Sequence, residues 1–160
     1  MDKQISLLVS YLNRCRATKI FLRLGYEFDN PTFGYSDNPE VYVLAFRKLV
    51  KYCRKNLNEE TLKRVLFVWH SWGAPMASDE LSLDRFYPGD DVVDWIGVSI
   101  FQQVFPWSKG LAGSMSDVEN VFQFARDHSK VSLHCLSFPL IYAVLDQAIL
   151  TCCIIANNGC

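Results

Sequence analysis

Residues 19–28, K-I-F-L-R-L-G-Y-E-F, decide how the rest of this sequence is interpreted. Their apolar beginning predicts a short, mostly buried strand. Polar residues gather where that strand ends, namely Glu27, Asp29 and Asn30. In α/β folds the working groups collect at the carboxyl ends of the strands. These ten residues therefore predict both a core strand and a candidate site.

Strand side chains alternate between two faces, so Glu27 is expected on the same face as Arg23 and Phe21. Tyr26 and Phe28 flank it in the sequence. Partial dehydration raises the pKa of a carboxyl group, so we expect Glu27 to stay protonated near neutral pH, as a general acid requires. Alternatively, Glu27 caps the strand and pairs with Arg23 or a loop lysine, because structural ion pairs also shift pKa values.

Helices and strands alternate on either side of this strand. Apolar residues at helical spacing predict a helix within residues 1–16. Asn38 followed by Pro39 predicts the start of a second helix that ends near Asn56. Further along, we expect strands at residues 64–70, 92–101 and 130–138, and a helix at 116–128 with Ser116 as its cap. A period near 40 residues predicts an α/β architecture, with parallel strands joined by crossover helices.

Bulk properties exclude some classes of protein. The 16 basic and 17 acidic residues give a net charge of −1, which indicates neither a nucleic-acid partner nor an anionic membrane surface. The six cysteines form no C-x-x-C pair, so we expect no metal site. The first residues show no signal-peptide pattern, and the localisation stays open. At 160 residues the chain is shorter than the roughly 250 residues of an eight-fold barrel.

Three stretches together carry a family resemblance: residues 23–29 (R-L-G-Y-E-F-D), 68–70 (V-W-H) and 87–98 (Y-P-G-D-D-V-V-D-W-I-G-V). Over residues 18–130 the sequence resembles glycoside hydrolase family 26, in particular its β-mannanases. The resemblance implies a partial TIM (β/α)8 barrel covering about strands four to seven. It also implies retaining hydrolysis of a β-linked polysaccharide, most naturally β-mannan, without a cofactor. Members keep an arginine four residues before the acid/base glutamate, which Arg23 and Glu27 match, so Glu27 is the implied catalytic acid/base.

Candidate substrate-binding residues are Arg23, Tyr26, Phe33, Tyr35, His70, Trp72, Phe101 and Trp107. Aromatic rings can stack on sugars, but each is also typical of ordinary packing. His70 could bond a substrate hydroxyl or a catalytic carboxylate, or could be a structural histidine. The sequence departs from the family at Tyr26, Asp29 and Phe101, where many members have His, Asn and Tyr. Xylan and mixed-linkage glucan therefore remain open as substrates.

The nucleophile is missing from its expected place. A retaining glycosidase needs a second carboxylate about 5 to 5.5 Å from the first. The resemblance places it at the end of the strand near residues 131–139, where V-S-L-H-C-L-S-F-P contains no Asp or Glu. We therefore expect little or no turnover from the chain as it stands. A non-catalytic carbohydrate-binding or scaffold role is the alternative.

From residue 133 the composition becomes apolar and rich in cysteine, so we divide the chain into a partial barrel domain, 1–132, and an atypical tail, 133–160. One hypothesis is that an error in the gene model replaced the authentic seventh strand. The 17 residues from Leu140 to Ala156 reach the lower limit for a membrane helix, but Asp146 among them opposes insertion. We expect a buried or poorly ordered helix there. The open sheet edges of a half-barrel predict self-association.

A serine hydrolase is a further alternative. Residues 69–73, W-H-S-W-G, are similar to a nucleophile elbow, with Ser71 followed by Asp94 and by His128 or His134. Trp69 occupies the place of the first glycine, where the tight turn needs a small residue. This argues against Ser71 as a nucleophile.

Overall fold

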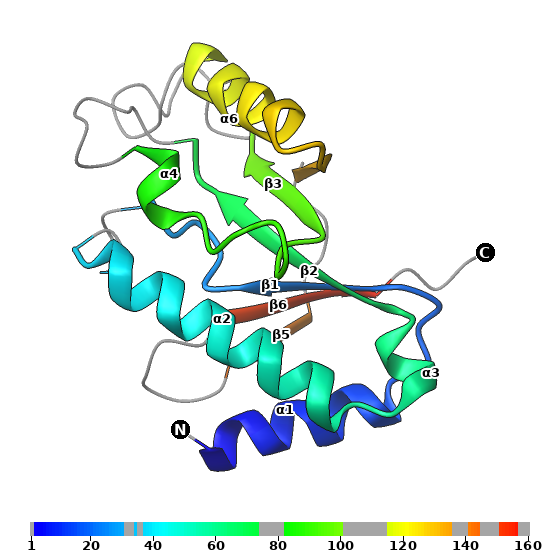
Figure 1. Ribbon diagram of the computed structural model, residues 1–160. Helices are drawn as coiled ribbons and strands as arrows, with labels where there is room; N and C mark the ends of the chain where they lie inside the picture. The colour runs from blue at the N-terminus through cyan, green and yellow to red at the C-terminus, as the bar shows by residue number, and fades with distance from the viewer. Residues whose placement is uncertain are drawn as a thin grey trace.

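The structure is a computed structural model that describes residues 2–30, 34, 37–73, 82–100, 115–135, 141–144 and 151–156. Figure 1 shows the arrangement of its elements. In chain order they are α1 (Asp2–Arg14), β1 (Ile20–Leu24), α2 (Pro39–Asn56), α3 (Glu59–Leu62), β2 (Val65–Ser71), α4 (Leu83–Phe86), β3 (Trp95–Ser99), α6 (Met115–Asp127), β4 (Val131–Cys135), β5 (Ile141–Val144) and β6 (Thr151–Ala156).

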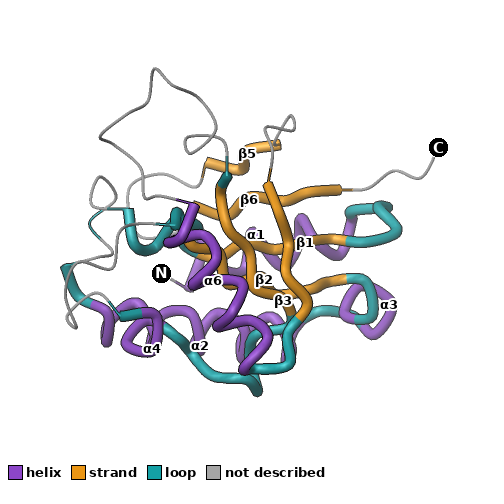
Figure 2. Tube along the Cα trace, turned by 90° about the horizontal axis from the view of Figure 1, so that it is seen from above, coloured by secondary structure: helices purple, strands orange, loops and turns teal. Residues whose placement is uncertain are grey.

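The strands form a single sheet in the order β4-β3-β2-β1-β6-β5. From β1 to β4 every pairing is parallel, and helices lie between successive strands in the chain. This confirms the predicted α/β class, and the arrangement is consistent with part of a (β/α) barrel. β6 then pairs with β1 in the antiparallel direction, and β5 pairs with β6. Figure 2 shows these two strands beyond β1, at one side of the sheet.

The two faces of the sheet differ in chemistry, because successive side chains point to opposite sides. One face joins the helices in the apolar core, through Ile20, Leu22, Leu24, Phe67, Trp69, Ile96 and Val98. The alternate positions carry buried polar residues, Arg23, His70 and Ser99. The polar groups of the candidate site thus belong to the face turned away from the helical core.

The helices follow local sequence signals closely. Asn38 caps α2, since its side chain accepts a hydrogen bond from the Val41 amide at 3.2 Å, and Pro39 begins the helix as predicted. The predicted stripe of α1 is buried: Ile5, Leu8, Val9 and Leu12. The predicted cap of α6 was wrong, because the helix already includes Met115 and Ser116 lies in its first turn.

The expected helix in the tail was also wrong. β5 and β6 occupy residues 141–144 and 151–156, and β6 lies along β1 with Ile20 opposite Ala156 and Leu24 opposite Cys152. These strands are rich in β-branched residues, and the otherwise unpaired edge of β1 offers them backbone partners. None of the described helices is long and apolar enough to cross a membrane.

Candidate active site

Glu27 lies in a tight turn directly after β1. Gly25 and Glu27 both have φ of 55°, which ends the extended strand at Leu24. The Glu27 amide then donates a hydrogen bond to the His70 carbonyl in β2, with an N···O distance of 2.7 Å. A glutamate seldom adopts this left-handed conformation, and such strain is common at functional sites. Glu27 therefore lies beyond the end of β1, where strand alternation no longer applies, but its carboxyl group contacts Ser99, on the predicted face of the sheet that also carries Arg23.

The Glu27 carboxyl group is buried, with 5% of the residue exposed, and both of its oxygens accept hydrogen bonds. The Ser99 hydroxyl donates to Oε1 at 2.7 Å, and the Asn30 amide donates to Oε2 at 3.3 Å. Burial raises the pKa of Glu27 above its ordinary value, and the negative charge of Asp29 adds to this, while Ser99, Asn30 and Arg23 oppose it. The predicted upward shift is confirmed. Burial is the largest of these effects and the Arg23 charge the smallest.

His70 is fully buried in β2 and lies one hydrogen bond further from Glu27. Its Nε2 atom is 3.1 Å from the Ser99 hydroxyl oxygen. Burial and the nearby Arg23 charge hold the pKa of His70 well below its ordinary value, so the ring is neutral. Gly97 makes room for the ring, because a Cβ atom there would lie 2.4 Å from His70 Nδ1. His70 therefore contacts the Glu27 carboxyl group indirectly, through the Ser99 hydroxyl.

Asp29, in the same turn as Glu27, ties this turn to the end of β2. It is 2% exposed. One carboxylate oxygen accepts from the Ser71 hydroxyl and the other accepts from the Trp72 amide at 2.6 Å. Both oxygens thus have protein donors, and Asp29 serves to hold β1 and β2 together where they end.

These contacts overturn the serine hydrolase alternative. The Ser71 hydroxyl is buried and donates its proton to the Asp29 carboxylate. A serine nucleophile would instead donate to a histidine that acts as its base. Asp94 lies at the start of β3, where it accepts a hydrogen bond from the Phe67 amide. Because β2 and β3 are parallel, Ser71 and Asp94 lie at opposite ends of the sheet. His128 bonds Asp90, also away from Ser71, and the side chain of His134 is not described.

The other predicted site residues fall into two groups. Arg23 is buried, with its guanidinium 5.2 Å from the centre of the Tyr26 ring, and Tyr26 packs edge-on against His70. Trp72 is also buried, at 8% exposed. Four predicted sugar contacts lie outside the described residues: Phe33, Tyr35, Phe101 and Trp107. Their role stays a prediction.

Sequence reasoning missed Ser99; it placed Asp29 and Asn30 at the polar end of the strand but did not predict their hydrogen bonds. Ser99 ends β3 in the same way that His70 and Ser71 end β2, so its place at a strand end was the available signal. The sequence alone does not predict the register between β2 and β3, which places Gly97 opposite His70. That register brings Ser99 within reach of both His70 and Glu27.

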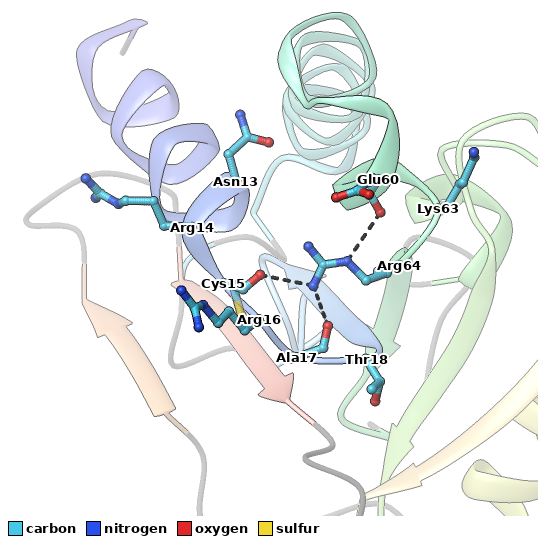
Figure 3. Close-up of a pocket in the computed structure, with 9 residues that line it drawn as sticks. All are labelled: Asn13, Arg14, Cys15, Arg16, Ala17, Thr18, Glu60, Lys63 and Arg64. Carbon is cyan, nitrogen blue, oxygen red and sulfur yellow. Dashed lines mark hydrogen bonds between the residues drawn. The ribbon is translucent and has the colours of Figure 1, made fainter.

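The opposite end of the sheet has a different character. A cavity of about 1040 Å³ opens there between α1 and α3 (Figure 3). It is lined by Asn13, Arg14, Cys15, Arg16, Ala17, Thr18, Glu60, Lys63 and Arg64. Arg64 donates to the carbonyl oxygens of Cys15 and Ala17, and so fastens the link between α1 and β1. Arg64 thus holds chain segments together at the end of the strands away from Glu27.

Comparison with known proteins relates the chain to glycoside hydrolases. No protein-family model matches the chain. A β-1,3-xylanase of Alcaligenes sp is 31% identical over 130 residues, which cover 80% of this chain and 24% of that protein. The β-1,3-xylanase TXYA of Vibrio sp is 31% identical over 129 residues, covering 79% and 25%. The chain is a distant homologue of glycoside hydrolases. It spans about a quarter of the length of these two relatives.

A relationship to glycoside hydrolases gives Glu27 a chemical context. Such enzymes need one carboxylic acid that holds its proton near neutral pH and, for retention, a second carboxylate as nucleophile. Glu27 is a buried carboxyl group whose pKa is raised. β4, Val131–Cys135, supplies no residue for the second. Within the described part of the chain, no three His, Cys, Asp or Glu side chains gather where they could hold a metal ion.

Proposed function

We propose that this chain carries the general acid of a retaining glycoside hydrolase, and that Glu27 is that acid. The observation that supports this most is the buried Glu27 carboxyl, held by Ser99 and Asn30 at the carboxyl ends of parallel strands, with its pKa raised. Burial favours the protonated form of a carboxyl group, which is the form that a general acid needs before it can donate. The distant β-1,3-xylanase relationship makes glycosidic oxygen the acceptor with the best support.

The proposed reaction is a double displacement. Glu27 donates its proton to the departing glycosidic oxygen while a second carboxylate bonds to the sugar. Glu27, now ionised, then takes a proton from the water that cleaves the covalent intermediate. Because β4 contains no carboxylate, the nucleophile has to come from residues other than those of this strand. We expect no measurable hydrolysis by the chain alone.

For the substrate, we propose a β-1,3-linked xylan, because both relatives are named for that activity. The sequence resemblance around Arg23 and Glu27 supports β-mannan as the alternative. Both substrates need the same acid. They differ in the sugar contacts, so an assay with the two polymers side by side separates them.

A hybrid enzyme tests the role of Glu27. The matched 130-residue stretch of the Alcaligenes xylanase is replaced by the corresponding stretch of this chain. Glu27→Gln in the hybrid should lower hydrolysis of β-1,3-xylan by about 100- to 10,000-fold. A dinitrophenyl xyloside should lose far less, because its leaving group departs without a proton. Glu40→Gln, which removes an exposed carboxylate on α2, is the matched control and should change neither rate.

Two results would contradict the proposal. One is an unchanged rate on xylan in the Glu27→Gln hybrid. The other is an equal loss on both substrates, which would indicate a structural defect and not the loss of a proton donor. If the hybrid is inactive but the chain binds xylan oligosaccharides in calorimetry, the non-catalytic binding role takes the place of the enzyme.

A further inference from the structure

Three buried groups from three neighbouring segments form a continuous hydrogen-bonded row. His70 in β2 is 0% exposed, Ser99 at the end of β3 is 4% exposed, and Glu27 after β1 is 5% exposed. The row runs from His70 Nε2 to Ser99 Oγ, at 3.1 Å, and from there to Glu27 Oε1, at 2.7 Å. We call these three residues the relay.

Ser99 has a single proton, so the relay has two arrangements. In the first, His70 Nε2–H donates to Ser99 and Ser99 donates to Glu27. In the second, Glu27 donates its carboxyl proton to Ser99, Ser99 donates to His70 Nε2, and the ring proton is on Nδ1. The second arrangement ties up the proton that a general acid has to give away.

The ionised form of Glu27 selects the first arrangement. A carboxylate has no proton to donate, so Ser99 has to donate to it, and Ser99 can then only accept from His70. If Nε2 carried no proton, two lone pairs would face each other across the 3.1 Å between Nε2 and Ser99 Oγ. Any acid that works through repeated cycles passes through this ionised form.

Because His70 is buried, we expect the histidine to keep the same tautomer, with its proton on Nε2, when Glu27 is protonated. The His70 ring is fully buried and neutral, so moving the proton between its nitrogens requires the site to open. Nδ1 lies against Gly97 and has no hydrogen-bond partner within the described residues. A proton on Nδ1 would therefore be a buried donor without an acceptor, which is costly. The same tautomer then serves both forms of Glu27.

We propose that His70 is a positioning residue that acts through Ser99. By keeping Ser99 a donor toward Glu27, it prevents the carboxyl proton from being used in an internal hydrogen bond. The last step, delivery of that proton to a sugar oxygen, rests on the proposed function. Asn30 contributes in the same sense, because it too donates to Glu27, at 3.3 Å. Neither donor can accept the acid proton, which stays available to an incoming acceptor.

The relay also acts on the pKa of Glu27, in the direction opposite to burial. Ser99 donates to the charged form of Glu27 and so lowers the pKa that burial raises. The other charged groups acting on Glu27 are Asp29, which raises its pKa, and Arg23, which lowers it. Loss of the Ser99 donor should therefore leave an acid that holds its proton too tightly.

The test uses NMR titration of the Glu27 carboxyl carbon in the full isotope-labelled chain. In Ser99→Ala the titration midpoint should rise by about one pH unit, the size of one charge-assisted hydrogen bond. His70→Phe should also raise it, because Ser99 is then free to accept the carboxyl proton. Ser71→Ala is the control: it removes an equally buried serine whose donor bond goes to Asp29, and should shift the midpoint by a few tenths at most.

A second measurement needs no variant. The ¹⁵N shifts of the His70 ring in the unaltered chain should place its proton on Nε2 throughout the Glu27 titration. A proton on Nδ1 would overturn the relay, as would an unchanged midpoint in a folded Ser99→Ala chain. Neither readout depends on hydrolysis. An inactive hybrid enzyme with these shifts intact would remove the proposed function and leave the relay standing.

Discussion

The two ends of the parallel sheet use the same kinds of side chain for opposite purposes. At the carboxyl end, Glu27 is 5% exposed, and burial raises its pKa. At the amino end, the Asp90 side chain is 58% exposed, and hydrogen bonds from Tyr87 and His128 lower its pKa. A carboxylate surrounded by donors in water stays ionised and fastens loops together. Glu27 also has two hydrogen-bond donors, so burial, and not the number of donors, sets the difference between the two carboxyl groups.

The largest effect should come from Asp29→Ala at the carboxyl end. Asp29 accepts from the Ser71 hydroxyl and the Trp72 amide, both buried. Its loss leaves two buried donors without acceptors, which should lower the unfolding free energy by about 3 kcal/mol. Urea unfolding measures this. A loss below about 1 kcal/mol would mean that water reaches this end of the sheet and replaces the carboxylate as the acceptor.

Gly97→Ala should cost somewhat less. The added Cβ would lie 2.4 Å from His70 Nδ1, and the neighbour is a buried ring and not a flexible chain end. Overpacking of this kind should lower the unfolding free energy by about 1 to 3 kcal/mol. It should also change the His70 ring shifts, which NMR can follow together with the unfolding. A fully stable protein with unchanged His70 shifts would contradict the close packing of this strand pair.

Glu27→Gln should stabilise the chain by about 1 kcal/mol at pH 7, because folding raises the Glu27 pKa and so costs free energy wherever the unfolded chain is ionised, a cost that the neutral amide avoids. The sign follows from linkage. The folded pKa of Glu27 is raised, so folding is favoured by protonation and loses free energy as the pH rises from the unfolded toward the folded pKa. The gain in Glu27→Gln should therefore appear above this window and vanish below it. Unfolding curves at pH 3.5 and 7 check it; a loss at pH 7 would contradict the burial argument.

Asp90→Asn should have the smallest effect, a loss within about 1 kcal/mol at pH 7, because exposed ion pairs contribute little. Here the sign is reversed. The folded pKa of Asp90 is lowered, so its contribution is present above the unfolded pKa and disappears as the pH falls through the folded one. Thermal unfolding at two pH values measures the difference. A large loss would remove the contrast between the two ends of the sheet.

Local signals predicted much of the fold. The Asn38-Pro39 cap, the apolar stripe of α1 and the buried strands at residues 20–24 and 65–71 all depend on neighbours in the sequence. The end of β1 was not predictable in this way. It depends on positive φ at Glu27, which strand alternation does not anticipate and which the hydrogen bond to His70 helps to fix.

The sequence singled out Glu27, His70 and the polar residues after β1, but not Ser99, which lies between His70 and Glu27. Glu27 could be found because an acid follows an apolar strand. Ser99 could not, because its importance comes from the register between β2 and β3, which places it between His70 and Glu27. The pairing of β6 with β1 was likewise beyond the sequence, because it depends on a sheet edge that exists only after the chain has folded.

The most direct measurement is the titration midpoint of the Glu27 carboxyl in the unaltered chain, followed by carboxyl ¹³C NMR. A buried acid that holds its proton predicts a midpoint clearly above the ordinary glutamate value of about 4.3. A midpoint at or below that value would mean that Glu27 is ionised near neutral pH and cannot be the proton donor.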